Sequence, residues 1–363
     1  MRGLEIAPLS CGVGAPRACC LAGALDTKPG WQTVGCQPMD DKASLEAQPS
    51  AARHRFSWYS RLLLLIVLLG VAYFIVANRG PLAEYQFRVG WGYIALGFAV
   101  AALNLLLMFG IWIVLSASFG VKTSVLQAGR AWFLSCLGKY VPGKVTLLLI
   151  RFAGYQGHSK RKIAVATGVE QVASIAAACI LSLGALLFTP TGLPAYVRWA
   201  AAGCALALLV LLWPPLLKRM VNFGFRLIRR EPLAETPSYF LILKCVGAYM
   251  LTGLLGGFGM FLVLNAFAPV SVKYYLTVTS CYYMAAIIGL LALFAPAGIG
   301  VREGVLFFVL SEFIPDIPRP AVIVGGITMR LVGTAAELSL AGAFVVLHRA
   351  SERARSHGSA GSS

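Results

Sequence analysis

The chain alternates long apolar segments with short polar ones. A run of about 20 apolar residues is long enough to cross the hydrocarbon core of a bilayer as a helix. Such runs predict full membrane-spanning helices at residues 62–78, 91–118, 163–188, 197–217, 239–267 and 321–347. The pattern predicts an all-α polytopic membrane protein.

Two further apolar segments, 124–157 and 274–313, are broken by short stretches rich in glycine and proline. The first break is Gly-Lys-Tyr-Val-Pro-Gly-Lys at 138–144, and the second is Ala-Pro-Ala-Gly-Ile-Gly-Val-Arg-Glu-Gly at 295–304. Because proline removes a backbone donor and glycine relaxes a helix, both breaks should be unwound. We predict that each segment forms two half-helices in a re-entrant hairpin. Eight full crossings are the alternative, since 274–295 alone is long enough to cross.

Lysine and arginine gather before the first predicted span, within 122–162 and 218–230, and after the last span. The positive-inside rule then places both termini in the cytoplasm. Each half of the chain reads span, span, hairpin, span, which is an odd number of crossings. The halves are therefore predicted to be an inverted repeat, a common plan for secondary transporters. The first hairpin would enter from the cytoplasm and the second from outside.

Composition agrees with a membrane protein. Hydrophobic residues make up 58% of the chain and charged residues 12%, whereas a soluble domain carries about 25% charged residues. The net charge of +17 comes largely from short loops beside apolar spans, so nucleic acid is not an expected partner. The nine cysteines have no metal-ligand spacing, and no nucleophile–base pair or nucleotide loop is recognisable. We predict no metal, no cofactor and no catalytic residue.

Three regions follow from these patterns. Residues 1–60 are predicted to be a disordered cytoplasmic tail, in which Met39 is the hypothesised start and 1–38 are not translated. Residues 61–348 form the membrane domain, and 349–363 form a basic cytoplasmic tail.

Charged residues near the first break are candidates for binding substrate. Four basic residues surround Tyr140, Pro142 and Gly143; they are Arg130, Lys139, Lys144 and Arg151. Freed N–H groups at the start of the second half-helix favour an anion, and arginine can bind two phosphate oxygens. A phosphate site is therefore predicted here. The alternative is that these side chains extend to the cytoplasmic interface and only set the topology.

Near the second break, Arg302 and Glu303 stand in the first turn of a helix. Glu303 either caps that helix at a membrane interface, or binds a cation, proton or cationic headgroup while Arg302 holds phosphate. Within the spans lie Glu170, Arg330 and Glu337, and the last two share a helix face because they are seven residues apart. These three mark a polar pathway or form a structural ion pair, for instance Glu170 with Arg330.

The block at 138–144 followed by Arg151-Phe152, then Glu170, then the block at 296–304 resembles the flippase-like transmembrane domain of lysylphosphatidylglycerol synthases. The resemblance covers roughly 60–350 and implies a stand-alone form without the synthase domain. It implies translocation of a lipid with a polar headgroup between leaflets. The resemblance also implies a site with two sides. The first is Lys139, Tyr140, Pro142, Gly143, Lys144 and Arg151; the second is Glu170, Pro296, Gly298, Gly300, Arg302 and Glu303.

We therefore predict a lipid flippase of the cytoplasmic (inner) membrane, not an enzyme, that moves a phosphate-bearing headgroup by rocking of its two halves. Glu303 or Glu337 could couple a proton to transport. The alternatives are a membrane-embedded transferase acting on a lipid-linked substrate, with Glu170 or Glu303 as acid or base, and a non-transporting scaffold for cell-envelope synthesis. The expected partners are an anionic or phosphate-bearing lipid, the membrane, cell-envelope synthesis enzymes and a second copy in a homodimer.

Overall fold

The computed structural model describes residues 85–86, 88–140, 146–188, 238–292, 298 and 300–360, with isolated positions at 76, 80 and between 195 and 222. The chain divides into the units Met1–Arg53 and His54–Ser363, and every described residue belongs to the second. The predicted tail at 1–60, all of the predicted span at 62–78 except residue 76, and more than half of the predicted span at 197–217 lie outside the described residues.

The described residues form helices and no β-strand. Five helices are long and apolar enough to cross a membrane: Trp91–Ser118, Lys160–Gly184, Phe240–Asn265, Val272–Leu291 and Arg319–Ala354. The predicted all-α polytopic membrane fold is confirmed for this part of the chain, and the protein is a multi-pass membrane protein.

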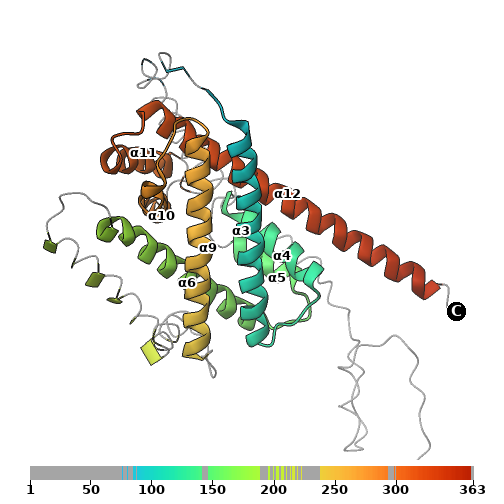
Figure 1. Ribbon diagram of the computed structural model, residues 1–363. Helices are drawn as coiled ribbons and strands as arrows, with labels where there is room; N and C mark the ends of the chain where they lie inside the picture. Colours follow the sequence, from blue (N-terminus) through green and yellow to red (C-terminus); the bar gives the residue numbers. More distant parts are fainter. Residues whose placement is uncertain are drawn as a thin grey trace, which may run out of the picture. The chain divides into compact units, whose positions relative to one another are not determined.

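Helices α3 (Trp91–Ser118) and α9 (Tyr239–Asn265) form an antiparallel pair, and they stand side by side in Figure 1. The Gly90 N–H, just before α3, donates to the Ala266 carbonyl just after α9, at 2.8 Å. A Cβ on Gly97 would lie 3.0 Å from the Val263 side chain, so this glycine lets the two backbones approach closely. The start of α3 and the end of α9 therefore lie together.

The first hairpin consists of α4 (Val125–Leu137), the 3-10 turn η1 (Gly138–Tyr140) and α5 (Thr146–Gly154). The Gln127 side-chain amide donates to the Gly154 carbonyl at 3.2 Å, which joins the start of α4 to the end of α5. At the other end Gly138 packs against Leu147. The 13 residues of α4 span about 20 Å, which is too short to cross a hydrocarbon core of about 30 Å.

The second hairpin consists of η2 (Val272–Tyr274), α10 (Tyr275–Leu291) and α11 (Val301–Phe313). The Tyr274 hydroxyl donates to Asp316 Oδ2 at 2.8 Å, and at the opposite end Gly289 packs against Arg302. The arms are therefore antiparallel, as in the first hairpin. They differ in length, because η2 and α10 together are long enough to cross a membrane whereas α11 has only 13 residues.

The two halves of the fold make corresponding contacts. Helix α6 (Lys160–Phe188) packs on α10, and helix α12 (Arg319–Ala360) packs on α4. In the same way α6 packs on α9, and α12 packs on α3. Because α3 and α9 are antiparallel, the halves have opposite orientations. The hairpins follow the ends of α3 and α9, so they enter from opposite ends of this pair.

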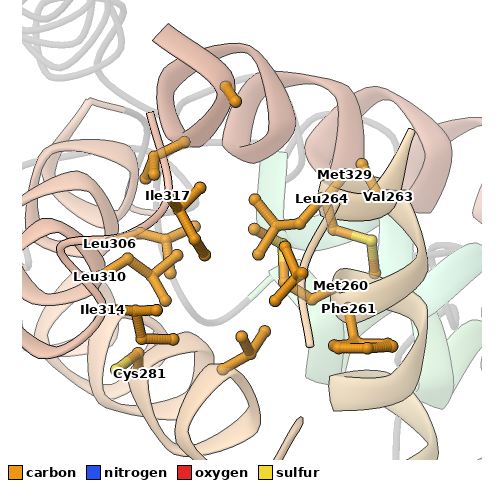
Figure 2. Packing of buried hydrophobic residues seen from close by; sticks show 14 of the residues in the cluster. Met260, Phe261, Val263, Leu264, Cys281, Leu306, Leu310, Ile314, Ile317 and Met329 are labelled. Carbon is orange, nitrogen blue, oxygen red and sulfur yellow. The ribbon is translucent and has the colours of Figure 1, made fainter. Parts of the chain in front are cut away.

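The core of the second half joins four helices. Figure 2 shows Met260 and Leu264 of α9 facing Leu310 of α11, with Cys281 of α10 and Met329 of α12 beside them. These side chains are almost fully buried. Their packing fixes α11 against α9 and α12, which positions the tip of the second hairpin.

Helix α12 extends beyond the predicted span at 321–347. Its 42 residues measure about 63 Å, roughly twice the hydrocarbon core. The residues after His348 are mostly alanine, arginine, glutamate and serine, of which the first three favour helix without being apolar. The His348 side chain also lies 3.2 Å from Glu352, one turn further on. Most of the predicted tail at 349–363 is thus a continuation of this helix.

Gly154→Ala is expected to destabilise the first hairpin. The added Cβ would lie 2.4 Å from the Ala131 Cβ of α4, so the two arms must separate, at a cost of about 1–3 kcal/mol. Thermal unfolding in detergent should show a lower midpoint. Gly168→Ala in α6, where nothing lies within 4 Å of the new Cβ, is the control and should leave the midpoint unchanged or raise it. Equal midpoints for both variants would contradict this packing.

Candidate functional site

Described residues beside the tips of the two hairpins line one cavity of about 80 Å³, which is larger than the roughly 10–15 Å³ that a single water requires. We call it the tip cavity. Its charged lining residues come from η1, α11 and α12; they are Lys139, Arg302, Glu303, Arg330 and Glu337. Tyr282 of α10 and Thr334 of α12 also line it. Five of the charged residues predicted from the sequence are therefore brought together, although they come from both halves of the chain.

Two ion pairs connect the hairpin tips to α12. Lys139 Nζ, at the tip of the first hairpin, pairs with Glu337 Oε1. In the first turn of α11, beside the tip of the second hairpin, Glu303 Oε1 lies 3.8 Å from Arg330 Nη1. Arg330 and Glu337 lie on the same face of α12, as their spacing predicts. This helix therefore holds one partner for each tip.

Glycines shape the start of α11. Gly298 and Gly300 have φ values of +68° and +84°, which residues other than glycine rarely adopt. A Cβ on Gly298 would lie 2.8 Å from the Gly289 carbonyl oxygen, so the chain passes directly over α10 here. The Gly300 N–H donates to Glu303 Oε2 at 2.7 Å. Glu303 thus caps its helix and lines the tip cavity at the same time.

Arg302 differs from the other cations of the tip cavity. Its guanidinium lies over the Tyr282 ring, 4.5 Å from the ring centroid. Among the described residues it has no carboxylate within 4 Å, and the neighbouring Glu303 is paired with Arg330. A cation–π contact holds the guanidinium in place without neutralising its charge. Arg302 is therefore available to bind an anion.

Arg151 and Glu170 form a separate, buried cluster in the first half. They pair with each other and are only 1% and 3% exposed. Arg151 Nε donates to Ser135 Oγ at 3.0 Å, and its Nη1 donates to Thr167 Oγ1 at 3.1 Å. The Trp132 indole N–H donates to Glu170 Oε1 at 2.9 Å. We call these five residues the Arg151–Glu170 cluster; the structural pair of Glu170 with Arg330 considered from the sequence is wrong.

The remaining predicted site residues are not brought into the tip cavity by the described part of the structure. Arg130 is half-buried in α4 and does not line the cavity. Tyr140 ends η1. Pro142, Gly143, Lys144 and Pro296 lie outside the described residues.

Sequence reasoning missed Tyr282, which supports the Arg302 guanidinium. In the sequence it is one more aromatic residue in an apolar segment. The adjacent pair Tyr282 and Tyr283 in the middle of a predicted helix was the available signal, since tyrosine hydroxyls within a bilayer need a partner.

The described residues include no group of three or more His, Cys, Asp or Glu side chains that could hold a metal ion. The tip cavity is thus a site of mixed cations and carboxylates on a multi-pass membrane fold.

Searches against models of protein families and against curated protein sequences found no match to this chain.

Proposed function

We propose that the protein is a lipid flippase, which moves a lipid with a phosphate-bearing headgroup between membrane leaflets. The observation that carries this proposal is that described residues of two hairpins, which enter from opposite ends of the α3–α9 pair, line one charged cavity. Broken helices that meet between inverted halves are where secondary transporters bind their substrates.

The charges of the tip cavity favour a phosphate. Lys139, Arg302 and Arg330 against Glu303 and Glu337 leave one net positive charge when all five are ionised. Arg302 has a fixed orientation and can bind two oxygens of a phosphate. The headgroup would occupy the cavity while the acyl chains remain in lipid, so that only the polar part crosses through protein.

The resemblance to the flippase-like domain of lysylphosphatidylglycerol synthases agrees with this function, and we propose membership of that family in a stand-alone form. The distribution of lysine and arginine further supports a location in the cytoplasmic membrane with both termini inside. Rocking of the two halves would open the membrane domain to one leaflet and then to the other.

The carboxylates favour transport over catalysis. A transferase would need a carboxylate that is available to exchange a proton with substrate. Glu303 accepts the Gly300 N–H and faces Arg330, Glu337 pairs with Lys139, and Glu170 is buried in its own cluster. Each carboxylate therefore already has a structural partner.

Leaflet transfer in proteoliposomes tests the proposal. Fluorescent phosphatidylglycerol, phosphatidylcholine and a neutral glycosyl diacylglycerol with matched acyl chains would be compared. The phosphate-bearing lipids are expected to transfer faster than in protein-free vesicles, because only they offer an anion to Arg302. The glycolipid is expected to transfer at the protein-free rate. Equal acceleration of all three lipids, or of none, would overturn the proposal.

A further inference from the structure

The Arg151–Glu170 cluster occupies the same place in the first half as the tip cavity does in the second. Trp132 is the eighth residue of α4 and Tyr282 the eighth of α10. Arg151 and Leu306 lie in the second arms of the two hairpins, α5 and α11.

The same correspondence holds for the long helices that cover the hairpins. Thr167 and Glu170 are the eighth and eleventh residues of α6. Gly326 and Met329 are the eighth and eleventh residues of α12. Trp132, Thr167 and Glu170 therefore each have a counterpart that lines the tip cavity, and the arm that corresponds to that of Arg151 lines it as well.

The two places differ in access. The cluster residues Trp132, Arg151, Thr167 and Glu170 are at most 5% exposed, so the space between the first hairpin and α6 is filled. The tip cavity is open, and the side chain of Lys139 within it is 43% exposed. The two halves of the fold therefore have different conformations: the first half is closed at the Arg151–Glu170 cluster, and the second half is open at the tip cavity.

We propose that the Arg151–Glu170 cluster is a closed gate, which opens to the opposite side of the membrane when the tip cavity closes. This inference rests on the proposed function, because two alternating gates serve only a transporter. In an inverted repeat, exchanging the conformations of the halves exchanges the two ends of the molecule. The space beneath Arg151 would then become accessible from the end opposite to that of the tip cavity.

The chemistry of the cluster suits a gate. A buried ion pair gains little net free energy, because the attraction between its charges is offset by their desolvation. When the first hairpin moves away from α6, water can hydrate both charges, so opening does not leave either one unpaired in an apolar site. An apolar seal of the same size would instead expose hydrocarbon to water.

Cysteine labelling from each side of the membrane tests the gate. The full chain, with its nine cysteines replaced by alanine or serine and with an unchanged unfolding midpoint, would be placed in liposomes. Ser135→Cys reports on the gate, and Thr167→Cys is a second reporter in case the first fails to fold. Thr334→Cys reports on the tip cavity. Ser116→Cys, equally buried in α3 but outside both places, is the control.

A membrane-impermeant thiol reagent is expected to label the Thr334→Cys and Ser135→Cys variants from opposite sides. Because a minor open state is populated at about 0.1–10%, the gate reporter should react at least about tenfold faster than the Ser116→Cys control. Labelling of the gate reporter no faster than the control, or from the same side as Thr334→Cys, would overturn the gate.

Leaflet transfer measured on the same vesicles separates this inference from the proposed function. Lipid transfer together with a protected gate reporter would overturn the gate and leave the flippase. Labelling from opposite sides without transfer of any phosphate-bearing lipid would support two gates and overturn the flippase.

Discussion

Arg151→Met is expected to lower the free energy of unfolding by about 3–5 kcal/mol, because it leaves the buried Glu170 carboxylate without its counter-charge. Arg151 and Glu170 are 1% and 3% exposed, so water cannot take the place of the lost guanidinium. Ser135 and Thr167 would also lose the donor to their hydroxyl oxygens. Thermal and denaturant unfolding in detergent, followed by tryptophan fluorescence, would measure the loss.

Two further variants decide whether the loss arises from an unpaired buried charge. The double variant Arg151→Met/Glu170→Gln removes both charges and is expected to be more stable than Arg151→Met alone. It also provides the comparison if the single variant accumulates only unfolded protein. Lys139→Met breaks the ion pair with Glu337, whose lysine is 43% exposed, and should cost about 1 kcal/mol or less. Equal losses for Arg151→Met and Lys139→Met, or a double variant less stable than the single, would contradict this account.

The length of the apolar runs predicts the described helices well, because bilayer thickness fixes how many apolar residues a crossing needs. The predicted span at 91–118 coincides with α3. Hydropathy fails at the end of α12, where alanine, arginine and glutamate continue the helix without being apolar. The glycines at 298 and 300 marked an unwound segment correctly, since both adopt positive φ.

The pairing of charges is much harder to predict. Sequence spacing correctly placed Arg330 and Glu337 on one face of α12, which is a property of a single helix. Which carboxylate meets which cation depends on how helices far apart in sequence are rotated and packed. Glu170 therefore looked equally able to pair with Arg330, whereas the hairpin fold brings Arg151 to it. Lys144 and Arg130 are, like Lys139, basic residues near the first break, yet only Lys139 is a described residue of the tip cavity.

Arg302→Gln is expected to reduce transfer of a phosphate-bearing lipid by about tenfold to a hundredfold. The change removes charge-assisted hydrogen bonds to phosphate, each of which contributes about 1.5–3 kcal/mol. Glutamine is shorter than arginine and uncharged, but it keeps a polar group in the tip cavity. Arg302→Lys keeps the charge but cannot offer two parallel donors, and an intermediate rate is expected. Initial rates of leaflet transfer in proteoliposomes would measure both effects.

Lys273→Gln is the matched control for Arg302→Gln. Lys273 lies at the base of the same hairpin, and its ammonium stands 4.7 Å from the Tyr274 ring centroid, so this variant also loses one positive charge and one cation–π contact. It lies outside the tip cavity and should transfer lipid at the wild-type rate. If both variants slowed transfer equally, the loss would come from overall charge, and Arg302 would have no special part in binding phosphate. Unchanged transfer in Arg302→Gln would place the headgroup elsewhere, because no other described cation of the tip cavity is without a carboxylate partner.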